Sequence, residues 1–333
     1  MAPMGPDYNN WLAMRDGRCD FWPKPSCGHP GEFQVMTVIA NAERSRTLRG
    51  MVLVAASAVV WSSGGPIVRS LESADTWTTI FWRSLFACVF LIAFMSLRRG
   101  HVVQQFIKMG LPGFFVGVSF ASASISLVIA LRLTTVANTL MIMSASPLFA
   151  AIMGRIFLGE AIRPITYVTI AAVMGGFALM VCDSLDSWSF AGDLFALVIA
   201  ISYATSVVLT RRYHLIGMVP AACWGTIIAT LVALPMASPL AITAHDLPIL
   251  LLFGMGQLGI GLALFAVGAS MIPASNTALL GMIEAVLGTL WTWLMFGERP
   301  VAFALAGGCI ILASIAANAF FGLKQQTVAA PLP

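Results

Sequence analysis

The chain has 333 residues, of which 59% are hydrophobic and only 10% are charged. Soluble domains are about 45–50% apolar and about 25% charged, so this composition excludes an ordinary soluble domain and indicates a protein of the lipid bilayer. The net charge of +4 comes from Lys and Arg residues that form no continuous basic stripe, and we therefore expect no nucleic-acid partner.

Residues 1–48 mix Pro, Gly, Asp and Arg and hold no apolar run long enough for the core of a signal peptide. We expect a mostly disordered cytoplasmic tail here, with Met36 as an alternative start of the functional chain. The six cysteines form no CxxC pair. Although Cys19, Cys27 and His29 lie near one another, we expect no metal site and no cofactor.

Apolar runs of about 20 residues follow from Gly50 onward, separated by short polar breaks, and this length lets a helix cross the apolar core of a bilayer. A short C-terminal tail, 322–333, comes after the last run. The sequence thus predicts ten transmembrane helices, at approximately 50–70, 76–97, 110–130, 136–158, 165–183, 192–212, 217–237, 247–270, 274–296 and 300–321.

Basic residues that flank a span in a short loop are retained on the cytoplasmic side, and they predict the orientation of the chain. If the N-terminal tail is cytoplasmic, only Arg69, Arg132 and Arg299 fall on the outer side. The predicted orientation places both termini in the cytoplasm. The cytoplasmic set would contain Arg15, Arg18, Lys24, Arg44, Arg46, Arg49, Arg98, Arg99, Lys108, Arg155, Arg163, Arg211, Arg212 and Lys324.

A stretch of the first half, residues 130–162, is repeated 138 positions later. The matching pairs are Asn138 and Asn276, Thr139 and Thr277, Gly159 and Gly297, and Glu160 and Glu298. This repeat predicts two related halves, 50–183 and 192–321. Five spans per half is an odd number, so the second half enters the membrane from the opposite side. We therefore expect two inverted five-helix repeats, an arrangement found in transporters.

Arg83 and Glu284 are the two ionisable residues predicted to lie well inside spans, where a charge usually faces a cavity or a partner. They lie at similar depth, so they are candidates to pair or to bracket a zwitterionic substrate. In the alternative, Arg83 extends toward the outer surface and Glu284 bonds to neighbouring backbone or hydroxyl groups. Glu284 is also a candidate for proton coupling, because burial disfavours the charged form of a carboxyl group.

Five further residues are candidates for the translocation pathway. Trp61 and Tyr203 occupy equivalent mid-membrane positions in the first helix of each half, and Ser146 is the first-half counterpart of Glu284. Asn138 and Asn276 lie early in helices 4 and 9, where helix capping or interhelical hydrogen bonding is the alternative to a gate. Glu160 and Glu298, at helix ends, are expected to be structural anchors.

Two glycine-containing segments are interpreted as features of helix packing. Residues 254–259 spell GxGxxG, but no strand precedes them, so a dinucleotide site is not expected. Their glycines, with Gly261, predict a close approach or a bend of helix 8. The Trp61–Pro66 run, WSSGGP, predicts a loosened outer half of helix 1.

Each predicted half ends its fourth helix in an apolar run followed by Gly-Glu, reading FLGEAI at 157–162 and MFGERP at 295–300, with SPLFAA at 146–151 and IEAVLG at 283–288 before them. In this the chain resembles the EamA-type transporters of the drug/metabolite transporter superfamily. It departs from their pattern where Glu284-Ala285-Val286 replaces Glu-Pro-Val. The resemblance implies a central cavity lined by helices 1, 3, 4, 6, 8 and 9, and export as the direction of transport.

We therefore expect an all-α integral membrane protein that exports small organic metabolites or drugs by alternating access. No GxxxxGK[ST] loop is present, so a gradient is the expected energy source. A passive channel is one alternative. An intramembrane enzyme is the other, but HExxH and GxSxG are absent and every aspartate is predicted to lie in a loop or tail. The expected location is a bacterial cytoplasmic membrane, with no oligomeric state implied.

Overall fold

The computed structural model describes residues 30–99, 101–159, 164–182, 189–213, 217–272, 274–300 and 302–329. Residues Met1–Arg46 and Thr47–Pro333 form two separate units, and the described part of the first is the N-terminal part of one helix. Every regular element in the described ranges is a helix. The predicted all-α membrane fold is thereby confirmed.

The helices coincide with the ten predicted spans, three of which are each divided into shorter segments. The first five spans comprise α2 (Pro30–Ser62) with α3 (Gly64–Arg69), α4 (Thr76–Arg99), α5 (Val102–Leu133), α6 (Val136–Met143) with α7 (Ser146–Leu158), and α8 (Pro164–Cys182). The others comprise α9 (Ser189–Arg212), α10 (Met218–Ala233), α11 (Asp246–Leu251) with η2 (Leu252–Ile260) and α12 (Gly261–Ala269), α13 (Ala274–Phe296) and α14 (Ala302–Ala329).

In the described ranges, 6 helical stretches are long and apolar enough to cross a membrane. The four other spans are shorter apolar helices at 164–176, 218–233, 280–296 and 302–317. The N-terminal boundary differs from the expectation, because α2 begins at Pro30 and residues 30–48 of the predicted tail are helical. Residues 1–29, including Cys19, Cys27 and His29, lie outside the described residues.

Two of the three divided spans have a proline at the break. α2 and α3 are separated at Ser63, beside Gly64, Gly65 and Pro66, because a proline cannot donate a helical hydrogen bond. α6 and α7 are separated at Ser144 and Ala145, just before Pro147 in the first turn of α7. The middle of the α11–α12 span is a π-helix, η2. The predicted weakness of helix 1 thus coincides with an observed break.

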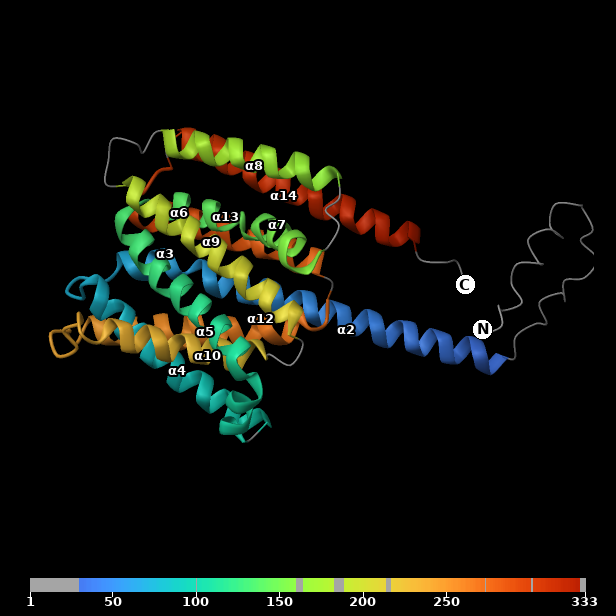
Figure 1. Cartoon of the computed structure of the whole chain (residues 1–333), viewed down its shortest axis with the longest axis horizontal. Coiled ribbons are helices and arrows are strands. Elements are labelled where there is room, and N and C mark those ends of the chain that lie inside the picture. The colour runs from blue at the N-terminus through green and yellow to red at the C-terminus, as the bar shows by residue number, and fades with distance from the viewer. Residues whose placement is uncertain are drawn as a thin grey trace, which may run out of the picture. The chain divides into compact units, whose positions relative to one another are not determined.

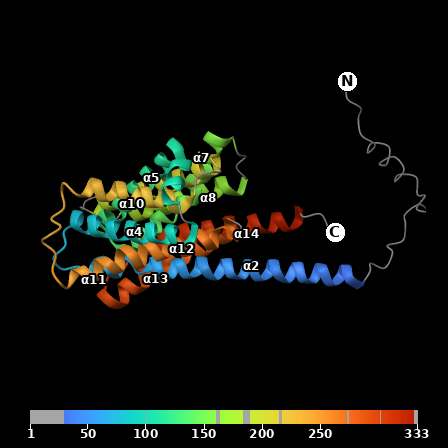
Figure 2. The same ribbon diagram turned by 90° about the horizontal axis from the view of Figure 1, so that it is seen from below.

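Helices of the two halves pack against one another, and each half therefore covers the apolar faces of the other. α5 packs against α9 and α10, α4 against α10, and α8 lies beside α14 along one edge of the bundle (Figure 1). The view from below shows α10 and α4 on one side and α12 and α13 on the other (Figure 2). The buried clusters between these helices consist mainly of Ala, Val, Leu, Ile and Met.

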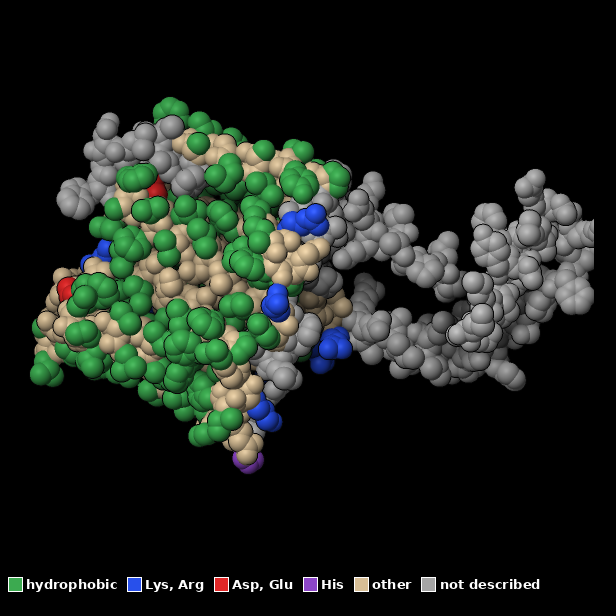
Figure 3. All heavy atoms as spheres, in the orientation of Figure 1, with side chains coloured by type: hydrophobic (Ala, Val, Ile, Leu, Met, Phe, Trp, Pro, Cys, Tyr) green, Lys and Arg blue, Asp and Glu red, His purple; other side chains and the backbone are tan. Residues whose placement is uncertain are grey.

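The surface of the bundle is apolar. Large hydrophobic side chains project from many helices, including Leu97, Ile107 and Val168, and green side chains cover most of the face in Figure 3. On that face the described Lys and Arg side chains gather mostly at one end of the bundle. Contiguous apolar surface of this extent is typical of contact with lipid.

Candidate functional site

Arg83 lies on α4 and is 1% exposed. Its Nη1 donates a hydrogen bond of 2.6 Å to Ser124 Oγ on α5, and its Nη2 donates one of 3.3 Å to Gln257 Oε1 on η2. The guanidinium carbon lies 4.5 Å from the centroid of the Phe253 ring. In the described part of the chain no carboxylate pairs with this charge. Arg83 is therefore buried inward, which differs from the alternative of an outward-extended side chain.

Arg83, Ser124, Phe253 and Gln257 form what we call the Arg83 cluster. Close contact of η2 with α4 positions this cluster. A Cβ atom on Gly254 would lie 2.5 Å from the backbone oxygen of Arg83, and one on Gly259 would lie 2.6 Å from the Phe90 ring. These two glycines let the helices approach closely, as the sequence predicted. Gln257 lies between these glycines in the sequence and faces α4, so its side chain accepts the hydrogen bond from Arg83.

Gln257 also connects Arg83 to Trp61. Its Nε2 donates a hydrogen bond of 3.2 Å to the backbone oxygen of Trp61. The half-buried Trp61 ring lies 5.1 Å from the Phe265 ring, and it packs so closely on Gly261 that a Cβ atom there would lie 2.3 Å from Nε1. Sequence reasoning missed Gln257. Its signal was a polar side chain in the middle of an apolar span.

Glu284 lies on α13 and is half-buried. Among the described residues its carboxylate has neither a hydrogen bond nor an ion pair, so it does not pair with Arg83 in this conformation. Tyr203 on α9 is also half-buried and makes an edge contact with Phe120, with ring centroids 6.1 Å apart.

Asn138 forms part of a buried hydrogen-bond network between α6 and α9. Its Nδ2 donates to both carboxylate oxygens of Asp193, at 3.2 and 3.4 Å, and Thr134 Oγ1 donates to the same carboxylate at 2.8 Å. Interhelical bonding, the alternative to a gate, is thus the observed contact of Asn138. The cap of α6 is instead provided by Thr135.

The prediction that every aspartate lies in a loop or tail is wrong for two residues. Asp193 lies within α9 and Asp246 begins α11, and both are 0% exposed. Hydrogen bonds make this burial tolerable. The Asp246 carboxylate accepts from the backbone nitrogens of Glu72, Ser73 and Ala74, and it thereby fixes the loop before α4.

The remaining two pathway candidates lie at helix starts. Ser146 is the first residue of α7, and its hydroxyl donates to the backbone oxygen of Met143 across the break between α6 and α7. Asn276 lies in the first turn of α13, and its side chain is outside the described part.

Glu298, just beyond α13, joins the two halves at one end of the bundle. Its Oε2 lies 2.9 Å from Arg69 Nε at the end of α3, and its Oε1 accepts a hydrogen bond of 2.8 Å from the backbone nitrogen of Val136 at the start of α6. Arg69 also donates to the backbone oxygen of Thr134, at 3.1 Å. These contacts agree with the anchoring role predicted for Glu298, whereas Glu160 lies outside the described residues.

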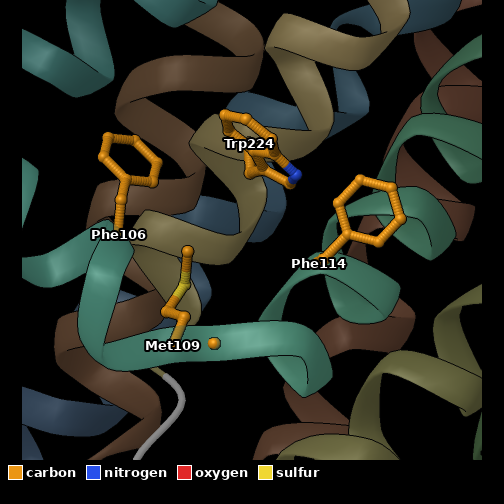
Figure 4. Close-up of a pocket in the computed structure, with 5 residues that line it drawn as sticks. Phe106, Met109, Phe114 and Trp224 are labelled. Carbon is orange, nitrogen blue, oxygen red and sulfur yellow. The ribbon is translucent and has the colours of Figure 1, made fainter.

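A small aromatic pocket lies at the kink of α5, where Gly110 has φ of +55° and Pro112 follows (Figure 4). It has a volume of about 120 Å³ and is lined by Phe106, Met109, Gly110, Phe114 and Trp224. No pathway candidate lines it. The pocket is therefore separate from the Arg83 cluster and from Glu284.

Buried polar side chains between apolar, discontinuous helices are typical of membrane transport proteins. Residues 48–182 and residues 190–320 each match the EamA-like transporter family. The chain belongs to this family, whose members are transporters and not enzymes, and it is a multi-pass membrane protein.

Individual relatives agree with this assignment. The chain is 27% identical over 241 residues to the pseudopaline exporter CntI of Pseudomonas aeruginosa (strain UCBPP-PA14), a match that covers 70% of this chain and 82% of the exporter. It is 24% identical over 282 residues to the uncharacterized transporter YdfC of Bacillus subtilis (strain 168), covering 82% and 91% of the two chains. A crystal structure at 19% identity shares the fold, with a TM-score of 0.61 over 87% of this chain and 100% of the other.

Proposed function

We propose that this protein is a secondary transporter that exports small organic metabolites or drugs by alternating access. The observation that supports it most is the contact of Glu298 with Arg69 and Val136, because it holds the two halves together at one end of the bundle. Alternating access requires such a closure at one end at a time. The breaks within the α2–α3 and α6–α7 spans add support, because discontinuous helices commonly line substrate sites.

In this proposal the translocation pathway runs between the two halves, 50–183 and 192–321. Trp61, Arg83, Tyr203 and Glu284 face the substrate, and Glu284 exchanges a proton during the cycle. The half-buried, unpaired carboxylate of Glu284 in the described part of the bundle supports that role. Asn138, Ser146 and Asn276 act at helix starts that shift between states.

The similarity to an exporter supports export as the direction, and its bacterial origin supports the cytoplasmic membrane as the location. We propose that both termini lie in the cytoplasm. The gathering of basic side chains at one end of the bundle favours a defined orientation, since such residues are retained inside (Figure 3).

Counterflow in proteoliposomes tests the proposal. Vesicles containing the full chain are loaded with one unlabelled compound, and uptake of the labelled compound is followed across a panel of amino acids, nucleosides, polyamines, cationic drugs and pseudopaline. A carrier gives saturable uptake that is accelerated by internal substrate. Flux that neither saturates nor shows exchange would indicate a passive channel and contradict the proposal.

A further inference from the structure

Arg83 carries a charge that the described protein does not neutralise. It is the only buried Lys or Arg among the described side chains. A guanidinium has five N–H donors. Two of Arg83's donors reach neutral acceptors, Ser124 Oγ and Gln257 Oε1, while its Nε has no acceptor among the described residues. A buried charge is strongly unfavourable unless an opposite charge or a full set of hydrogen bonds compensates it.

The neighbouring groups compensate this charge only in part. The Phe253 ring attracts the guanidinium from 4.5 Å, but a ring carries no net charge. The described buried carboxylates, Asp193 and Asp246, are held by other donors, and Glu284 forms no ion pair with Arg83. No carboxylate among the described residues thus supplies the opposite charge, and the carboxylate of a bound molecule would supply it.

We propose that Arg83, held by Ser124 and Gln257, is a subsite for a carboxylate group of the transported substrate. This inference rests on the proposed transport function. A carboxylate fits because its single negative charge matches the single buried cation. A phosphate monoester carries close to two negative charges and would need a second buried cation. The planar guanidinium also matches the two oxygens of a carboxylate in geometry.

The surroundings of Arg83 suit an amphiphilic acid. Ser124 and Gln257 orient the guanidinium without cancelling its charge, and both are replaceable partners because they are neutral. The Phe253 ring offers aromatic surface close to the charge. In this conformation Arg83 is covered, so the carboxylate binds when the contact with Ser124 or Gln257 opens.

The test uses pairs of compounds that differ only in the carboxylate: N-acetyl amino acids and the corresponding N-acetyl amino acid amides. Binding to the purified full chain is measured from the shift in the thermal unfolding midpoint with probe concentration, and transport is measured by counterflow. We expect at least one acid to bind the wild-type protein about tenfold more tightly than its amide, the effect of one charge-assisted hydrogen bond.

Arg83→Gln should reduce the ratio of acid to amide affinity to about one. Arg83→Lys keeps the positive charge but lacks the planar guanidinium that donates two parallel hydrogen bonds. It should therefore retain a smaller preference for the acid. Arg132→Gln is the matched control, because Arg132 bonds Ala74 and Thr79 at the end of α5 and its loss changes the net charge equally. That control should keep the wild-type ratio.

The outcomes separate this inference from the transport function. If the wild-type protein binds no acid, binds amides equally well, or keeps its preference in Arg83→Gln, the carboxylate subsite is wrong even where counterflow of other compounds persists. If acids bind with the expected ratio but no compound shows exchange, the subsite stands and the proposed transport function fails. If Arg83→Gln does not fold, the ratio of acid to amide affinity in the wild-type protein and in Arg83→Lys still decides whether Arg83 binds a carboxylate.

Discussion

The buried polar side chains of this bundle differ in how completely their hydrogen bonds are satisfied. Asp246 accepts three backbone N–H groups and the Ser73 hydroxyl, and Asp193 accepts from Thr134 and Asn138. Such carboxylates hold the fold together. Glu284, by contrast, has no partner among the described residues and is half-buried, so it is available to a proton or a substrate.

Glu284→Gln should separate exchange from proton coupling. With a gradient of about one pH unit, coupling of one proton gives about tenfold accumulation of substrate, because one pH unit is equivalent to a factor of ten. An amide cannot exchange a proton, so the variant should show counterflow but no accumulation driven by the gradient. Uptake into proteoliposomes with and without a pH gradient measures this.

Glu72→Gln is the control for that experiment, because Glu72 is exposed in the loop before α4 and only its backbone nitrogen forms a hydrogen bond there. It should accumulate substrate like the wild-type protein. Unchanged accumulation in Glu284→Gln would remove this carboxylate from the coupling mechanism.

At the scale of the helix, close packing at glycines determines where polar side chains meet. η2 reaches α4 at Gly254, and α12 reaches the α2 helix at Gly261 and Gly268. These contacts place Gln257 between Arg83 and Trp61. In a membrane, where lipid is as apolar as the helix surface, small residues are the main means of bringing backbones together.

Gly254→Ala should destabilise the protein. The added Cβ would lie 2.5 Å from the Arg83 backbone oxygen, so η2 and α4 would have to move apart, and overpacking of this kind costs about 1–3 kcal/mol. The midpoint of thermal unfolding in detergent should fall. Gly281→Ala is the matched control, since a Cβ there meets nothing within 4 Å. Alanine is favoured over glycine inside a helix by about 0.5–1 kcal/mol, so this change should not destabilise the protein. Equal effects of the two changes would refute this account of the packing.

At the scale of the whole molecule, the ends of α3, α6 and α13 meet through Glu298, and this contact links the two halves. Arg69 and Glu298 side chains are 25% and 20% exposed, so solvent screens the ion pair and its contribution is modest, about 1 kcal/mol. This ion pair therefore contributes only a small part of the free energy that holds these three helix ends together.

Glu298→Gln should open this end of the bundle more often. Val136 contacts Glu298 through its backbone nitrogen and is 1% exposed, so a cysteine placed there by Val136→Cys reports the opening. Loss of about 1 kcal/mol should raise its rate of labelling by a membrane-impermeant thiol reagent about fivefold. The control is the same cysteine with Glu298 intact. An unchanged rate would show that the ion pair does not hold this end closed.

The orientation of the molecule is tested by cysteines at two exposed loop positions in a cysteine-free background. Glu72 lies between α3 and α4, and His101 between α4 and α5. A cysteine at 72 should react with an impermeant reagent in intact cells, and one at 101 only after permeabilisation, because the proposed orientation places them on opposite sides. The reverse pattern would invert the topology.

The amino-acid sequence by itself determined the ten spans, the repeat and the break near Pro66, because lipid requires continuous apolar helices and proline interrupts them locally. It also identified Arg83 and Glu284, since any charge in an apolar run stands out. It did not determine the helix at residues 30–48, the burial of Asp193, or the role of Gln257. Those depend on tertiary structure: Arg83 and Gln257 are 174 positions apart, and only the packing of η2 on α4 brings them within hydrogen-bonding distance.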